Sequence, residues 1–142
     1  MSVLRVAVVG CGPRAKRSHL PHLKTFDDVE VVALCDPIPA ARDAAGDEFG
    51  VSRRYSGVGE LLDAEVGSLD AVFVATPAHL NAQVALACLE RGVNTLLEKP
   101  PGMSVKETVA LRDAAESYGA KAMVGWNRRF HPIVVRAREM VE

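Results

Sequence analysis

The stretch Leu4-Arg5-Val6-Ala7-Val8-Val9-Gly10-Cys11-Gly12-Pro13-Arg14-Ala15 decides the fold of this 142-residue chain. Its first half predicts a buried strand, and its second half is a G-x-G-x-x-A turn that opens a helix. Gly10 permits a tight turn, Gly12 lets a diphosphate approach the backbone, and the small Ala15 allows close packing of helix and strand. Free N–H groups at such a helix start attract phosphates, so Gly10, Gly12, Pro13, Arg14 and Ala15 are candidates for cofactor binding. A glycine turn that merely joins two elements is the alternative.

Short apolar runs recur along the chain and alternate with segments of helical spacing. The predicted strands are 4–9, 29–35, 69–75, 93–98 and 120–124, with a weaker one at 53–55. The predicted helices follow the glycine turn and span 39–49, 80–91 and 104–118, the last with a Ser104/Glu107 capping box. Runs with apolar residues at consecutive positions are typical of parallel strands that are covered on both faces. The sequence therefore predicts a three-layer α/β fold of the doubly wound Rossmann type, with six parallel strands in order 3-2-1-4-5-6.

The composition limits the function classes. With 49% hydrophobic residues the chain can bury one core, and 17 Lys and Arg against 18 Asp and Glu give no broad field that favours nucleic acid or an anionic membrane. No apolar run approaches the length of a membrane span or a signal-peptide core. Cys11, Cys35 and Cys88 are too widely separated for a disulfide framework or clustered metal ligands. We expect a cytoplasmic protein without a metal site.

Asp36 ends the second predicted strand, 21 residues after Ala15, where an acidic residue binds the ribose hydroxyls of NAD. A carboxylate there repels the 2′-phosphate of NADP, so NAD is the expected cofactor and NADP the less favoured one. The charge of nearby Arg42 would weaken that discrimination. An Asp before Pro37 is also a common turn opener, but its register with the glycine turn favours cofactor binding by Asp36 and Pro37.

The segment Ala75-Thr76-Pro77 follows the fourth predicted strand. Ligands of open α/β sheets bind at the carboxyl ends of the strands, where the strand order reverses. These three residues are therefore candidates for the cofactor site. A purely structural Thr-Pro turn is an equally good interpretation.

Two further segments carry a family resemblance, Leu97-Glu98-Lys99-Pro100-Pro101 after the fifth strand and Trp126-Asn127-Arg128-Arg129-Phe130-His131-Pro132. With the glycine turn they resemble the family of glucose–fructose oxidoreductase, inositol dehydrogenase and rhizopine-catabolism proteins. The resemblance implies that Lys99 orients the substrate hydroxyl or exchanges a proton with it, and an ammonium group does stabilise developing alkoxide charge. It also implies that Glu98, Lys99, Asn127 and Arg128 lie beside the cofactor. A solvated loop lysine is the alternative for Lys99.

The chain departs from the family pattern in two respects. Family members often have a histidine where this chain has Asn81, although Asn81 can still form hydrogen bonds to the cofactor. Family enzymes also continue for about another domain, roughly 200 residues, which completes the catalytic group. The resemblance thus predicts an NAD-binding domain, residues 1–125, of an oxidoreductase for a sugar, cyclitol or related polyol. Residues 126–142 would lead towards an absent substrate domain, so that the chain alone binds NAD but is catalytically incomplete.

Other functions stay open. A non-enzymatic nucleotide sensor or partner module would use the apolar helix predicted at 132–142 to bind another protein or a second copy. An S-adenosylmethionine-dependent methyltransferase also has a glycine turn and an acidic residue on its first two strands, but Glu98-Lys99-Pro100 argues against it. His19 and His22 have a spacing that metal sites use, yet no third ligand lies near them, which favours packed or surface histidines.

Overall fold

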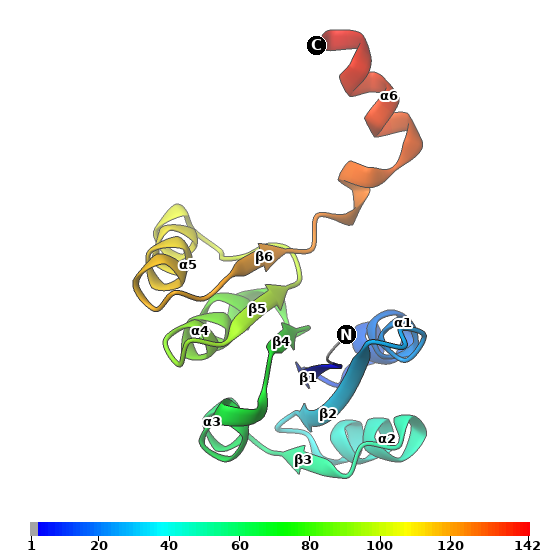
Figure 1. The fold of residues 1–142 in the computed structure, drawn as a ribbon, viewed down its shortest axis with the longest axis vertical. Helices are drawn as coiled ribbons and strands as arrows, with labels where there is room; N and C mark the ends of the chain where they lie inside the picture. Colours follow the sequence, from blue (N-terminus) through cyan, green and yellow to red (C-terminus); the bar gives the residue numbers. More distant parts are fainter. Residues whose placement is uncertain (1–2) are drawn as a thin grey trace.

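A computed structural model describes residues 3–142, with the side chain of residue 66 left out. It contains a single parallel sheet of six strands in the order β3-β2-β1-β4-β5-β6 (Figure 1). The strands are β1 (Leu4–Val9), β2 (Val29–Cys35), β3 (Arg53–Tyr55), β4 (Ala71–Val74), β5 (Asn94–Leu97) and β6 (Ala122–Val124). The predicted fold class and strand order are confirmed. The last three strands are shorter than predicted, because the residues at their predicted ends, such as Leu69, Val93 and Ala120, lie in the adjoining loops.

Helices cover both faces of the sheet, which explains the consecutive apolar residues in the strands. One face is covered by η1 (Ala15–His19), α1 (Leu20–Leu23) and α2 (Pro39–Phe49), and the other by α3 (Val58–Glu65), α4 (Ala78–Leu89) and α5 (Val105–Ser117) (Figure 1). Within β1, Val6 and Val8 belong to one hydrophobic core cluster, whereas Ala7 and Val9 belong to the other. A short 3₁₀ turn, η2 (Val66–Ser68), leads from α3 to β4. The three layers are therefore those of the predicted Rossmann fold.

The helix after the glycine turn is wider than a regular α-helix. Its first part, η1, is π-helical, and the N–H of Leu20 donates to the carbonyl of Ala15. Pro21 follows directly, and in a regular α-helix its ring would clash with the carbonyl of Arg17. The wider turn relieves that clash, and such bulges are frequent at functional sites.

Two local features differ from the predictions. The helix α3 was not predicted, because its apolar pattern is short and only Leu61 and Leu62 bury large apolar side chains. At α5, the hydroxyl of Ser104 accepts the N–H of Glu107 at 3.2 Å as a capping box requires. The Glu107 carboxylate, however, accepts the N–H of Met103 at 2.7 Å instead of that of Ser104. Only half of the capping box therefore forms.

The last helix, α6 (Pro132–Val141), extends away from the sheet (Figure 1). It follows the 3₁₀ turn η3 (Asn127–Phe130) and has no buried residue. Ile133 and Met140 are 73% and 74% exposed, so the apolar side chains of α6 face solvent. Within residues 3–142, no helix combines the length and the apolar character needed to span a lipid bilayer.

Candidate functional site

The carboxyl ends of three neighbouring strands form one edge of the sheet. Backbone hydrogen bonds continue just beyond the strands, from the N–H of Ala75 to Val9 at 2.8 Å and from the N–H of Glu98 to Val74 at 2.9 Å. A crevice of about 460 Å³ opens at this edge. Its lining residues are Arg14, Ala75, Thr76, Glu98, Lys99, Asn127 and Arg128. All seven belong to the set that the sequence predicts.

The two glycines of the turn have different surroundings. Gly10 has a positive φ of 97°, and a Cβ atom added to it would lie 2.5 Å from the carbonyl oxygen of Ala75. A Cβ atom on Gly12 would meet no atom within 4 Å. Gly10 is thus required for packing between the β1 and β4 loops, whereas Gly12 leaves the backbone open towards solvent. Such an open backbone next to a helix start fits a diphosphate.

Asp36 is fixed between the ends of β1 and β2. Its Oδ2 atom accepts the N–H of Cys11 and its Oδ1 atom the N–H of Ile38, both at 2.8 Å, and the residue is 8% exposed. Each carboxylate oxygen has a second lone pair, so both can accept a further hydrogen bond from a ribose hydroxyl. Arg42 donates to the backbone carbonyl of Asp36 at 3.3 Å and to the side chain of Asp43 at 3.2 Å. The arrangement fits the adenosine ribose of a dinucleotide.

Glu98 is the centre of a polar cluster at the crevice. Its Oε1 atom accepts hydrogen bonds from Arg14 Nε at 2.9 Å and from His19 Nε2 at 2.8 Å. Its Oε2 atom accepts the backbone N–H of Lys99 at 3.3 Å. Burial by itself would raise the pKa of Glu98, but the hydrogen bonds from Arg14 and His19 and the charge of Arg14 outweigh it and lower the pKa. Glu98 is therefore a carboxylate at neutral pH, and His19 Nε2 is the donor.

His19 is a member of the site that the sequence did not predict. Its ring packs against Phe73 with 4.3 Å between the ring centroids, which confirms the expectation of a packed histidine. Burial lowers the pKa of His19 below its ordinary value, so the ring is neutral at pH 7. The partner, Glu98, is 79 residues away in the sequence, and no local pattern indicates such a contact. A second hollow beside the crevice is lined in part by His19, Phe26 and Phe73.

The side chain of Asn81 lies in the protein interior next to the site and does not line the crevice. The side chain is fully buried, accepts the hydroxyl of Thr76 at 2.9 Å, and donates to the carbonyls of Glu98 at 3.0 Å and Pro100 at 2.9 Å. The Lys99–Pro100 peptide bond is cis. Asn81 thus joins the β4 and β5 loops, and its side chain is not at the surface of the crevice. The sequence predicted it as a cofactor-binding residue, but in the structure its contacts are with these two loops.

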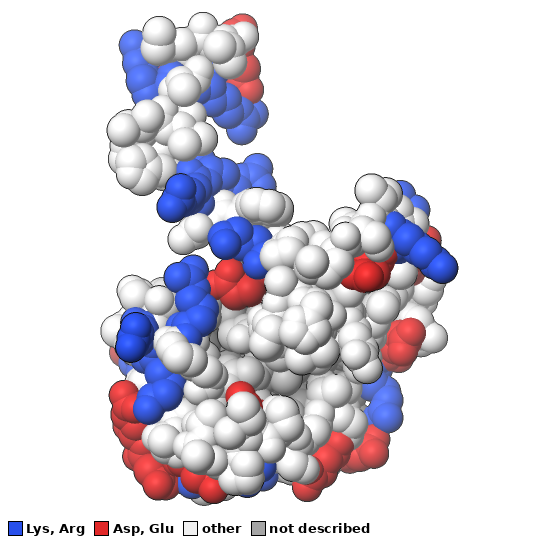
Figure 2. All heavy atoms as spheres, turned by 180° about the vertical axis from the view of Figure 1, so that it is seen from behind, with Lys and Arg blue, Asp and Glu red and all other residues white. Residues whose placement is uncertain are grey.

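The remaining predicted residues differ in their exposure. Pro13, Pro37 and Pro77 are exposed and do not line the crevice, whereas Ala15 is fully buried under the glycine turn. Figure 2 shows basic side chains gathered around the narrow connection to α6, with an acidic group beside them. This connection contains Arg128 and Arg129.

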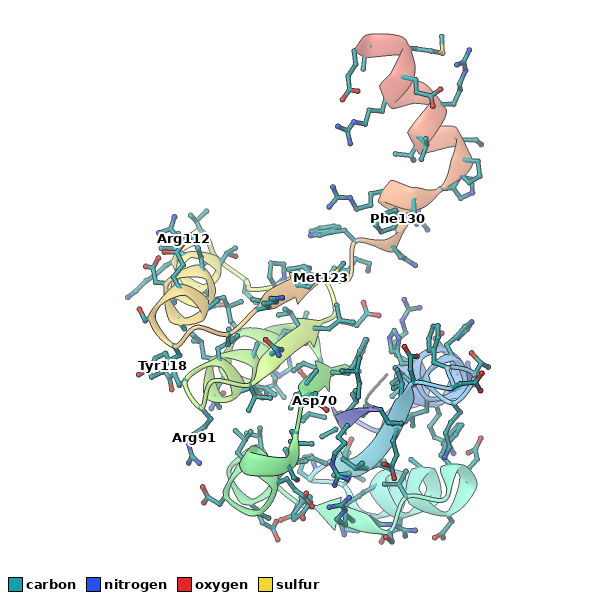
Figure 3. All side chains as sticks on the ribbon, in the orientation of Figure 1. Asp70, Arg91, Arg112, Tyr118, Met123 and Phe130 are labelled. Atoms are coloured by element: carbon teal, nitrogen blue, oxygen red, sulfur yellow. The ribbon has the colours of Figure 1, made fainter. Side chains whose placement is uncertain are left out.

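Two large apolar side chains lie near this connection. In Figure 3, Phe130 projects from the segment before α6 and Met123 lies on β6. The two residues are 68% and 57% exposed. The exit from the sheet therefore combines basic and apolar surface.

The sheet topology, the open glycine turn and the carboxylate at the end of β2 define a dinucleotide-binding Rossmann domain. Residues 4–126 match the family model described as "Oxidoreductase family, NAD-binding Rossmann fold". The chain belongs to this family, which is the Gfo/Idh/MocA family that the sequence resembles.

Curated relatives and solved structures agree with this assignment. The chain is 34% identical over 128 residues to D-apiose dehydrogenase of Paraburkholderia graminis and 32% identical over 140 residues to the rhizopine catabolism protein MocA of Rhizobium meliloti. These matches cover 90% and 98% of the chain but only 33% and 42% of the relatives. The WlbA dehydrogenase of Chromobacterium violaceum, solved with NADH and UDP-GlcNAcA, superimposes with a TM-score of 0.90 at 26% identity, over 98% of this chain and 39% of that one.

Proposed function

We propose that this chain is the NAD-holding part of a dehydrogenase that transfers hydride between NAD and a hydroxyl-bearing carbon of a sugar, cyclitol or related polyol. One observation supports cofactor binding above all others. The carboxylate of Asp36 is fixed by the N–H of Cys11, directly beside the open backbone of Gly12. A ribose acceptor and a diphosphate site are therefore adjacent, as a dinucleotide requires.

Residues in and beside the crevice would each bind a different part of the cofactor. The backbone at Gly12 and the side chains of Arg14 and Arg128 would hold the diphosphate, and Asp36 would hold the adenosine ribose. Glu98 would lie beside the nicotinamide ribose. When bound, NAD supplies the atom that accepts or donates the hydride.

Lys99 would act on the substrate. Its side chain lines the crevice, and the residue follows Glu98 directly after β5. The buried Asn81 donates hydrogen bonds to the carbonyls of Glu98 and Pro100 in the same loop. An ammonium group there positions the substrate hydroxyl and stabilises the negative charge on oxygen as its proton leaves. Lys99 would then be the catalytic residue of this chain, and Asn81 a positioning residue.

NAD would be preferred over NADP. The Asp36 carboxylate would repel a 2′-phosphate, and Arg42 is already engaged with Asp36 and Asp43. The family does include NADP-bound structures, such as that of the 3-ketoreductase KijD10 from Actinomadura kijaniata, which is 27% identical to this chain. In this chain, Asp36 at the end of β2 would set the cofactor choice.

We place the domain boundary near residue 125, at the end of the sheet. Residues 1–125 would form the nucleotide-binding unit, and residues 126–142 would lead to a substrate domain like the part of the relatives that the chain does not span. The exposed apolar side chains of α6 would pack on that domain or on a partner. The chain alone would then bind NAD but turn over little substrate.

Calorimetry with NAD⁺, NADP⁺ and S-adenosylmethionine tests this function. We expect saturable binding of NAD⁺, weaker binding of NADP⁺ and no binding of S-adenosylmethionine. Folded protein that binds neither nicotinamide nucleotide would refute the proposal. In a dehydrogenase that contains this chain together with a substrate domain, the Lys99→Ala variant should bind NAD⁺ normally and lose most of its turnover. Full retention of the biological role in that variant would favour a non-enzymatic sensor.

A further inference from the structure

Arg14 and His19 both donate to the same oxygen of Glu98, but the side chain of Arg14 is more exposed and freer to move than that of His19. Arg14 Nε and His19 Nε2 both donate to Glu98 Oε1, at 2.9 and 2.8 Å. The side chain of Arg14 is 55% exposed, whereas those of His19 and Glu98 are 17% and 12% exposed. The ring of His19 is also held against Phe73. Arg14 can therefore leave Glu98 without disturbing the core, while His19 cannot.

The position of Arg14 places it next to a stronger anion in the proposed complex. It follows Gly12 and Pro13 at the start of the helix, where the diphosphate of NAD would bind. A diphosphate has two negative charges and several acceptor oxygens, and the planar guanidinium group pairs well with phosphate. Glu98 offers a single negative charge and already has a second donor in His19. The diphosphate is therefore the better partner for Arg14.

We propose that Arg14 moves from Glu98 to the diphosphate when NAD binds, and that His19 then holds the Glu98 carboxylate in place as a positioning residue. The inference rests on the proposed function, because it needs a diphosphate at the glycine turn. It assigns to His19 a role that the sequence does not indicate. Through Glu98, His19 also supports the loop of Lys99, whose backbone N–H donates to Glu98 Oε2.

If Arg14 moves in this way, NAD binding should be coupled to the uptake of a proton by His19. Burial lowers the pKa of His19, the hydrogen bond and charge of Glu98 raise it, and the charges of Arg14 and His22 lower it further. Because Nε2 already donates to Glu98, an added proton goes to Nδ1. When Arg14 leaves Glu98, one of the positive charges that oppose protonation moves away, so the pKa of His19 rises. NAD binding should therefore take up a fraction of a proton, and the affinity should fall as the pH rises through the titration range of His19.

Calorimetry in two buffers measures this proton directly. NAD⁺ is titrated into the protein at pH 6.5 in PIPES and in imidazole, and the difference in apparent enthalpy gives the number of protons taken up. We expect fractional uptake by the wild type and by the control His22→Gln. His19→Gln keeps a donor for Glu98 but does not titrate, so its binding of NAD⁺ should take up no proton. Binding of NAD⁺ without uptake by the wild type, or unchanged uptake by His19→Gln, would overturn the exchange and leave the proposed function intact.

A second measurement tests the coupling without cofactor. The pKa of His19 is followed by NMR in the free wild type and in Arg14→Gln, and we expect a higher pKa in the variant. An unchanged or lower pKa would show that Arg14 does not control the protonation of His19, and would refute the proton linkage. If NAD⁺ does not bind to folded wild type, both the proposed function and the exchange are wrong.

Discussion

Gly10 lies so close to Ala75 that a Cβ atom on Gly10 would stand 2.5 Å from the carbonyl oxygen of Ala75. Gly10 also has a φ of 97°, which a residue with a Cβ atom rarely adopts. We therefore expect Gly10→Ala to lower the free energy of unfolding by about 2 kcal/mol or more, as measured by urea denaturation.

Gly12→Ala is the matched control for that substitution. A Cβ atom there meets nothing within 4 Å and no positive φ is required, so stability should change by less than about 0.5 kcal/mol. The added methyl group would nevertheless stand where the diphosphate approaches, and NAD⁺ affinity should fall at least tenfold. Equal stability losses in the two variants would contradict the different roles assigned to the two glycines.

The fold could be predicted from the sequence because its signals are local. Each signal can be recognised within one or two neighbouring elements: the apolar run before Gly10, the acidic residue at the end of β2 and the glycines after the helices. The site could be predicted only in part. Its members at the ends of β4 and β5 follow from the topology, since parallel strands bring their carboxyl ends to one edge.

The contacts inside the site could not be predicted in the same way. The ion pair of Arg14 with Glu98 joins residues that are 84 positions apart, and it depends on how the first helix is placed over the sheet. The burial of Asn81 likewise depends on the rotation of α4, which sets whether a helical residue faces the crevice or the interior. Only the three-dimensional arrangement decides these two points.

Asp36→Asn tests the ribose site. The amide oxygen can keep one of the two backbone hydrogen bonds, but the negative charge and one acceptor are lost. We expect NAD⁺ affinity to fall by roughly tenfold to a hundredfold, which corresponds to about 1.5–3 kcal/mol for hydrogen bonds to a charged group. NADP⁺ should lose less affinity, because the repulsion of its 2′-phosphate is removed. A parallel loss for both nucleotides, measured by calorimetry, would contradict the role of Asp36 in cofactor choice.

Glu65 should make stability depend on pH in the acidic range. Burial would raise its pKa, but hydrogen bonds from Tyr55 and Ser68 and the charge of Arg53 lower it below 4.5. A carboxylate with a lowered pKa in the folded state stabilises the protein above its ordinary pKa, and this contribution is lost as the pH falls through the folded-state value.

Glu65→Gln should therefore lower the free energy of unfolding at pH 7 by about 1–2 kcal/mol. The difference from the wild type should shrink below pH 4.5. Asp63→Asn, on the exposed face of the same helix, serves as the control. Its ion pair with Arg91 is solvent-exposed, so the substitution should change stability by less than about 1 kcal/mol at either pH. A difference between wild type and Glu65→Gln that does not vary with pH would show that the Glu65 carboxylate makes no such contribution.

The three cysteines should be unreactive in the folded protein. Cys11, Cys35 and Cys88 are buried, and burial raises the pKa of each thiol to about 12. At pH 8 almost no thiolate is present, so DTNB should react only at the rate of unfolding. In denaturant all three thiols should react within minutes. Rapid labelling of Cys11 under native conditions would show that the glycine turn opens to solvent.

The most direct test of the account is an NMR titration of the isotopically labelled chain with NAD⁺. Saturable shifts of the backbone amides of Gly12, Arg14, Asp36, Thr76 and Glu98 are expected, with no comparable change in α5 or at the amino-terminal ends of the strands. A spectrum of folded protein that stays unchanged at millimolar NAD⁺, or shifts confined to residues far from this edge of the sheet, would contradict it.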